Sequence, residues 1–202
     1  MRSPIPAAAS VLLATSLLLT GCSLSTPGES TPTEQSTESE APEQGSPSLD
    51  AEPAAGETIS GDGYTYVVPE GWAVPEQSVA GFDPDTLAAN LQDTDGFADN
   101  VNVLKSPAGV VTPDVVESAG VKELESVGAT DITVNDRVTI AGSESAHLSA
   151  ALSSEGTDYG VEQYYVSTDD QTYIVTFSFS DSVSAADRVG VAESILVTWT
   201  WV

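Results

Sequence analysis

The segment Thr172–Ser180, TYIVTFSFS, carries the clearest β-strand signal in the sequence. Large apolar side chains alternate along it with hydroxyl-bearing ones, and successive side chains of a strand point to opposite faces of a sheet. We therefore expect a strand with one face in a core and the other face, with Thr176, Ser178 and Ser180, directed away from it. The expected core face comprises Tyr173, Val175, Phe177 and Phe179.

Further strand-like segments precede this one. Tyr64–Val68 alternates and stops at Pro69, and Asn100–Ser106 places Val101 and Val103 on one face. Between the latter segment and Thr172 the pattern predicts three more strands, at residues 131–136, 137–152 and 158–167.

A helix is predicted from Thr112 to Gly128. Thr112 can cap it, Pro113 suits the first helical position, and Gly128 is a typical residue after a helix end. The expected buried face comprises Val116, Ala119, Leu124 and Val127.

Two further helices are predicted from their first residues. Asp83 as a cap followed by Pro84 predicts a short helix within residues 82–91. Ser184, with Asp187 three residues later, forms a capping pattern for a final helix. Its expected buried stripe comprises Ala185, Val189, Ala192 and Leu196.

Strands joined by hairpins, with helices near each end, favour an antiparallel α+β fold. The chain contains, in this order, the motifs YTYVVPEGW, NVNV, VTIAGSESAHL, YYVSTDDQTYIVTFSFS and AESILVTWTW. This order of elements resembles that of actinobacterial LpqN/LpqT-type lipoproteins. The resemblance implies a PsbP-like α/β/α sandwich, an antiparallel sheet flanked by helices. It also implies an envelope lipoprotein that binds partners or ligands and carries no catalytic motif.

The start of the sequence predicts where the protein is held. Residues 7–19 form an apolar run about 20 Å long as a helix, shorter than the ~30 Å core of a bilayer, as expected of a signal peptide. The run ends in LTGC, Leu19–Cys22, which resembles the lipobox of bacterial lipoproteins. This resemblance implies that residues 1–21 are removed and that Cys22 carries acyl chains such as palmitate. The alternative is a free or structural thiol. Cys22 is the only cysteine, so no disulfide is possible.

Residues 22–57 are expected to be a solvated tether. The stretch after Cys22 holds five prolines, eleven serines and threonines and eight acidic residues, with no basic or aromatic residue. Such a composition buries too little apolar surface to offset the entropy of ordering. We therefore expect residues 58–202 to form one globular domain, anchored to the cell membrane on its extracytoplasmic face.

The domain is strongly acidic. The full chain has 31 acidic and 5 basic residues. Nucleic acid is a poor partner for such a chain, because binding phosphates requires a basic patch. Two interpretations of the acidity stay open: a solvated surface that maintains solubility, or a surface for a cationic partner or for divalent ions.

The sequence contains no clear catalytic or metal motif. His147, the only histidine, is expected on an exposed, serine-rich face, and no G-x-S-x-G pattern accompanies it. The loop Asp93–Asn100 resembles a calcium loop, but Phe97 and Leu104 stand where that loop requires oxygen ligands. We expect no metal and no cofactor. A carboxylate pair acting on envelope polymers stays open as the alternative.

The remaining candidate is an aromatic cleft. Four aromatic residues are candidates for its lining: Tyr64, Trp72, Trp199 and Trp201. They could line a ligand cleft between the sheet and a helix, or they could simply be part of the hydrophobic core. The favoured interpretation is a non-catalytic binding module. The expected partner of this module is an envelope protein or a small apolar or lipidic ligand. The module is also expected to be held at the membrane by the lipid on Cys22.

Overall fold

A computed structural model of the chain describes residues 46–77 and 81–202. The predicted signal peptide, the lipobox with Cys22 and the tether up to residue 45 lie outside the described residues. None of the described helices has the length and apolar character needed to span a bilayer.

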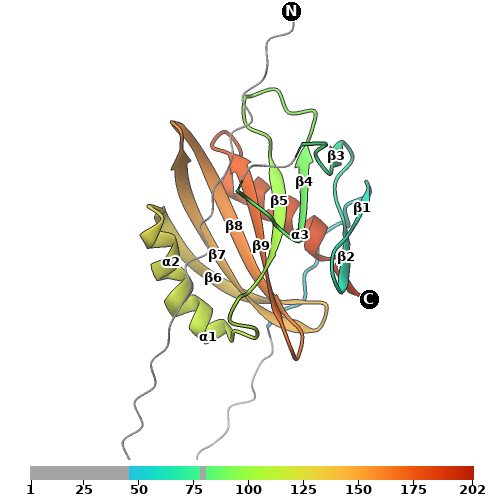
Figure 1. The fold of residues 1–202 in the computed structure, drawn as a ribbon, viewed down its shortest axis with the longest axis vertical. Coiled ribbons are helices and arrows are strands. Elements are labelled where there is room, and N and C mark those ends of the chain that lie inside the picture. Colours follow the sequence, from blue (N-terminus) through green and yellow to red (C-terminus); the bar gives the residue numbers. More distant parts are fainter. Residues whose placement is uncertain (1–45, 78–80) are drawn as a thin grey trace, which may run out of the picture.

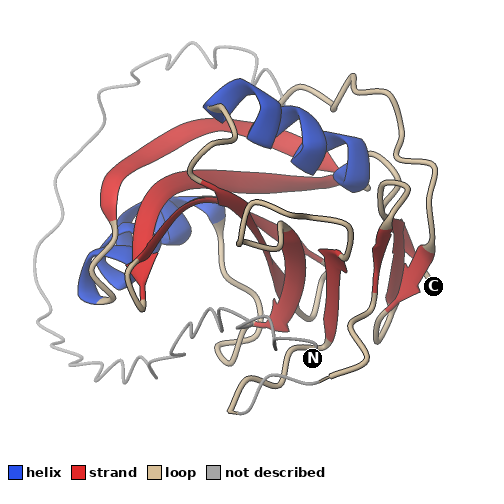
Figure 2. Cartoon of the chain, turned by 90° about the horizontal axis from the view of Figure 1, so that it is seen from above, coloured by secondary structure: helices blue, strands red, loops and turns tan. Residues whose placement is uncertain are grey.

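The described residues form two antiparallel sheets and helices on both faces of the larger one (Figures 1 and 2). The large sheet has the strand order β3-β4-β5-β9-β8-β7-β6, and the small sheet has the order β1-β2-β10. The large sheet comprises β3 (Trp72–Ala73), β4 (Thr86–Asn90), β5 (Asn100–Lys105), β6 (Thr130–Ile140), β7 (Ser143–Ser154), β8 (Thr157–Ser167) and β9 (Thr172–Ser180). The small sheet comprises β1 (Thr58–Ser60), β2 (Tyr64–Val67) and β10 (Thr200–Trp201). This architecture confirms the predicted α+β class.

Strand β9 lies at the centre of the large sheet, between β5 and β8. Its predicted core face is confirmed, since all four apolar side chains are buried. The hydroxyl face is buried as well: Thr176 and Ser178 have no exposed surface. Both faces of the sheet are therefore interior at this point, which the alternation alone did not indicate.

The helix predicted from Thr112 to Gly128 is present as three consecutive pieces: α1 (Pro113–Val115), the π-helical turn η1 (Val116–Gly120) and α2 (Val121–Ser126). Val116 and Leu124 pack on the sheet, while the other two predicted face residues are only half-buried. Gly120 allows the close approach, because a Cβ there would lie 3.0 Å from Leu148. Thr112 occupies the cap position, but its side chain makes no capping hydrogen bond.

The short helix predicted within residues 82–91 is wrong. The segment forms β4, where Ala88 pairs with Val101 of β5 and Ala89 with Ala73 of β3. Leucine and alanine favour helices by less than about 1 kcal/mol per residue, so pairing on both sides outweighs their preference.

The predicted boundary between residues 136 and 137 is also wrong. Strand β6 continues to Ile140, and the turn to β7 is at Ala141 and Gly142, both with positive φ. A two-residue hairpin turn of this kind requires positive φ at both positions, and Ala-Gly is a weaker signal for it than Asn-Gly.

Helix α3 (Ala185–Leu196) begins as predicted. Ser184 Oγ accepts a hydrogen bond from the amide of Asp187 and donates one to its carboxylate at 2.6 Å. The second half of the predicted stripe is buried, at Ala192 and Leu196, but Ala185 is exposed. The first turns of α3 lie beside an open groove and do not cover the core.

Part of the predicted tether lies on the domain. The carbonyl of Pro47 accepts a hydrogen bond from Thr139 at 2.8 Å, and the amide of Ala54 donates one to Ser194 at 2.8 Å. Leu49 also packs against the main core. Residues 46–57 are therefore part of the folded body, because their backbone groups find partners there.

The β6–β7 turn generates a stability prediction. Ala141 has a φ of 47°, a conformation that asparagine tolerates and alanine disfavours by about 1 kcal/mol. We expect Ala141→Asn to raise the free energy of unfolding by about 0.5–1 kcal/mol. Urea titration of the full chain measures this, with Ala141→Val as the opposite control. A lower midpoint for the asparagine variant than for wild type would contradict the proposed turn geometry.

Candidate functional site

The four aromatic residues of the predicted cleft lie in or beside the main core. Tyr64 and Trp199 stack with ring centroids 4.3 Å apart, and both are buried. Trp72 is buried against Phe179, and Trp201, half-buried, lies edge-on to Trp199. Neither of the two pockets described below is lined by these rings. A ligand-binding role for them stays a prediction.

The acidic loop Asp93–Asn100 binds its own backbone. Asp95 accepts a hydrogen bond from the amide of Phe97 at 2.9 Å, which lowers the pKa of that carboxyl. Burial raises the pKa of Asp99 to about 6, and the charges of Asp93 and Asp95 add to the effect. Within the described residues, no group of three or more potential ligand side chains could hold a metal ion.

The prediction that His147 lies on an exposed face is wrong. The residue is buried, its Nε2 lies 2.9 Å from Oε2 of Glu162, and its ring stacks on Tyr164 with centroids 4.0 Å apart. His147 is enclosed because Tyr164 of the neighbouring strand β8 stacks on its ring and Arg188 of α3 reaches its partner Glu162.

Glu162 is the centre of this buried cluster. One carboxylate oxygen accepts from Ser149 and faces His147, and the other accepts from Arg188 Nε at 3.1 Å. Burial by itself raises the pKa of Glu162, but the hydrogen bonds from these three side chains outweigh it and hold the pKa below its usual range. Glu162 is thus an ionised carboxylate in the protein interior.

The backbone of β8 allows this pairing. A Cβ at position 160 would lie 2.6 Å from the guanidinium carbon of Arg188, so Gly160 leaves space for that group above the strand. Arg188 also donates to the carbonyl of Val183 at 3.1 Å. Sequence reasoning missed this cluster, although the charged Glu162 within the largely apolar residues 159–166 was an available signal.

The cluster forms one wall of an open groove of about 760 Å³, between the first half of α3 and strands β6, β7 and β8. Its lining includes Asp131, Asn135, Ser149, Glu162, Arg188 and Val189. Asn135 donates to Ser149 at 2.7 Å, so the central polar groups of the groove are bound to one another.

This arrangement lacks the geometry of a nucleophilic triad. Such a triad requires the histidine to take the proton of the nucleophilic hydroxyl. Here Ser149 donates to Glu162, and His147 faces that same carboxylate. Ser149 and His147 therefore each face Glu162 and not each other.

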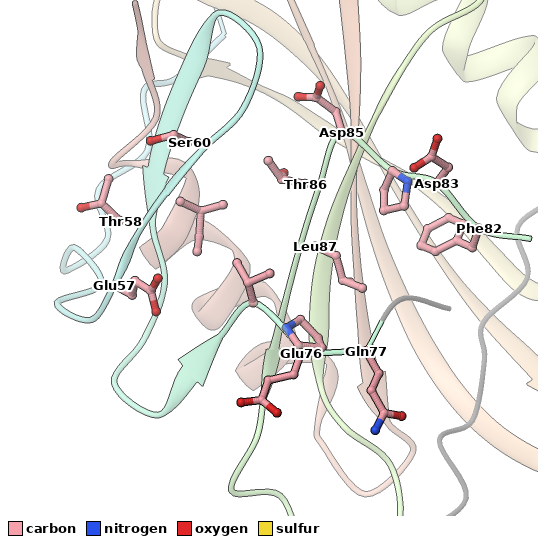
Figure 3. Close-up of a pocket in the computed structure, with 14 residues that line it drawn as sticks. Glu57, Thr58, Ser60, Glu76, Gln77, Phe82, Asp83, Asp85, Thr86 and Leu87 are labelled. Atoms are coloured by element: carbon pink, nitrogen blue, oxygen red, sulfur yellow. The ribbon is translucent and has the colours of Figure 1, made fainter. Parts of the chain in front are cut away.

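A second hollow of about 640 Å³, the β1–β4 slot, lies between the two sheets and is lined by residues 57–60, 74–77 and 82–87 (Figure 3). At one end Asp85 joins the walls, accepting hydrogen bonds from the Tyr64 hydroxyl at 2.7 Å and from the amide of Asp62 at 3.0 Å. The lining includes four carboxylates, Glu57, Glu76, Asp83 and Asp85, and no basic side chain.

No family model and no curated protein sequence matches the chain. A crystal structure of LpqN, involved in cell envelope biogenesis of Mycobacterium tuberculosis, is similar at a TM-score of 0.50 and 14% identity, over 71% of this chain and 88% of that one. Cyanobacterial PsbP (CyanoP) from Synechocystis sp. PCC 6803 has a TM-score of 0.49 and 15% identity, over 72% and 92%. A protein from Bacteroides thetaiotaomicron has a TM-score of 0.43 and 19% identity, over 69% of this chain and only 45% of its own. The likeness to LpqN confirms the expected resemblance at the level of fold.

The Glu162 cluster generates a prediction. Arg188→Met would leave the buried carboxylate without its guanidinium partner, and we expect a loss on the order of 3 kcal/mol in the free energy of unfolding at pH 7. Because the pKa of Glu162 lies below its ordinary value of 4.5, the network stabilises the fold above that pH and less as the pH falls below it. The deficit of the variant should therefore shrink in acid. Denaturant titration at pH 7 and 4 measures both effects, with the exposed Lys122→Met as control. A deficit unchanged at pH 4 would contradict the proposed charge pairing.

Asp99 generates a prediction of opposite sign. Its pKa of about 6 exceeds the ordinary value of 3.8, so the folded state loses stability as the pH rises from 3.8 through 6. Asp99→Asn removes this loss, and we expect a gain of about 1 kcal/mol at pH 7.5 after allowance for solvent screening. The gain should vanish near pH 3.5. Thermal melts across this range test it, and a variant less stable than wild type at pH 7.5 would refute it.

Proposed function

We propose that the chain is a lipoprotein of the bacterial cell envelope, anchored through Cys22, with a non-catalytic binding module on the extracytoplasmic side of the membrane. The LTGC motif after a short apolar run supports the anchor, because it combines a signal-peptide length with a lipidation cysteine. Two or more acyl chains make such anchoring stable.

The closed hydrogen-bond network around Glu162 carries the binding interpretation. Its carboxylate oxygens are both bound, and the serine and histidine beside it face that carboxylate and not each other. The ionised Glu162 carboxylate can accept a hydrogen bond from a ligand in the groove, and His147 is not aligned to activate Ser149.

The fold supports the envelope assignment. LpqN, which shares the fold, is described as involved in cell envelope biogenesis. Membership of the LpqN/LpqT-type group is part of this proposal.

A second candidate function is hydrolysis of an envelope polymer. Asp95 and Asp99 lie in one loop, where the hydrogen bond from Phe97 lowers the pKa of Asp95 and burial raises that of Asp99 to about 6; unequal pKa values are one feature of an acid–base pair. Neither carboxylate lines the groove or the slot, so the binding interpretation is preferred. Turnover of glycan or ester substrates, abolished by Asp99→Asn in a folded variant, would reverse this order.

The anchor is tested by substitution of Cys22. We expect Cys22→Ala to move most of the protein from the membrane fraction to the medium, and to abolish incorporation of labelled palmitate. Fractionation and immunoblotting measure the first, and metabolic labelling the second. Ser23→Ala is the matched control. Retention of the alanine variant on the membrane would disprove the lipid anchor.

A further inference from the structure

We infer that the β1–β4 slot binds an extended, cationic segment of a protein partner, which adds a strand to the free edge of β1. This goes beyond the proposed function, which is argued from the Glu162 groove, because it names a second site and the class of partner that this site would bind.

The backbone of β1 supplies unpaired groups. Two backbone hydrogen bonds close the ends of the β1–β2 hairpin. At one end the amide of Gly61 donates to the carbonyl of Tyr64, and at the other end the amide of Val68 donates to the carbonyl of Glu57. Hydrogen-bonded and non-bonded pairs alternate in an antiparallel ladder. The amide and carbonyl groups of Thr58 and Ser60 therefore point away from β2, at an exposed edge with no further strand among the described residues. Such an edge can pair with an extended peptide.

The slot provides space for alternate side chains of the added strand. Val74, which is 54% exposed, lines the slot together with Phe82 and Leu87; the last two are labelled in Figure 3. Pro75 follows Val74 and lacks an amide hydrogen, and the pairing of β3 with β4 ends at Ala73. A strand at the β1 edge would direct every second side chain onto this apolar surface.

The charge of the slot selects the partner. Glu57, Glu76 and Asp83 form no hydrogen bond or ion pair between their side chains and any other described residue, and Lys105 is engaged by Asp62 beyond the Asp85 end. A second copy of the chain would bring the same carboxylates to the edge, and like charges oppose that pairing. A segment that alternates lysine or arginine with apolar residues satisfies both the carboxylates and the apolar wall.

The test uses the full chain in detergent micelles and a short, capped, fluorescent peptide of alternating lysine and valine. We expect saturable binding by fluorescence anisotropy at 20 mM salt, weakened about fivefold or more at 200 mM salt because exposed charges are screened. The double variant Glu57→Gln/Glu76→Gln should lose about fivefold in affinity. Glu125→Gln, an exposed carboxylate on α2, is the control and should bind as wild type.

Backbone pairing has its own control. Methylation of alternate peptide amides preserves the charge and removes donors, and we expect it to weaken binding at least tenfold. Equal binding of the methylated peptide, of a glutamate–valine peptide, or of the double variant would overturn the inference. Absence of binding of the lysine–valine peptide would also overturn it. The same holds if the chain cross-links to itself as a dimer that the peptide does not dissociate. Release of the Cys22→Ala chain from the membrane is measured independently of peptide binding. A negative binding result would therefore refute the inference about the slot without refuting the lipid anchor.

Discussion

The structure depends on burial of both faces of the seven-stranded sheet at its central strands. Helix α3 covers one face and the α1–η1–α2 segment covers part of the other. An unpaired buried polar group costs about 1–3 kcal/mol, which favours apolar or hydrogen-bonded side chains on β8 and β9 between these layers. Glu162 is the extreme case, and it is ionised only because Arg188, His147 and Ser149 surround it. Gly160 contributes to this arrangement, because its lack of a side chain leaves space for the guanidinium of Arg188. Two hydroxyls on β8 and β9 depart from the pattern, since those of Tyr164 and Ser178 are buried without a hydrogen-bond partner among the described residues.

The small sheet closes the end of the main core. It brings β1 and β2 together with β10 at the other end of the chain, and Tyr64, Tyr66 and Trp199 form a nearly parallel stack there. The hydroxyls of both tyrosines lie 3.0 Å from Thr86 Oγ1, which joins the small sheet to β4. Burial raises the pKa of Tyr66 to about 12, so the ring stays neutral in this contact. Thr86, which holds this contact, is also one of the residues that line the β1–β4 slot.

The distribution of charge connects the fold with the proposed function. Three of the four basic side chains in the described residues are engaged by carboxylates: Lys105 by Asp62, Arg188 by Glu162, and Arg137 by Asp114, Glu117 and Glu144. Most of the acidic side chains therefore lack a basic partner, and the field around the domain is negative. Such a field favours cationic partners and disfavours nucleic acid. In the slot this field coincides with an open strand edge and an apolar wall.

The sequence by itself determined the features that depend on neighbouring residues. The alternation in Thr172–Ser180 predicted β9, Ser184 with Asp187 predicted the start of α3, and Gly128 predicted the end of the helix before β6. Only the tertiary structure decided that β4 is a strand, that His147 is buried, and that Glu162 meets Arg188 across 26 residues. The reason is physical: local periodicity reports which side chains share a face, but elements distant in the chain decide what covers that face and which charges it can hold.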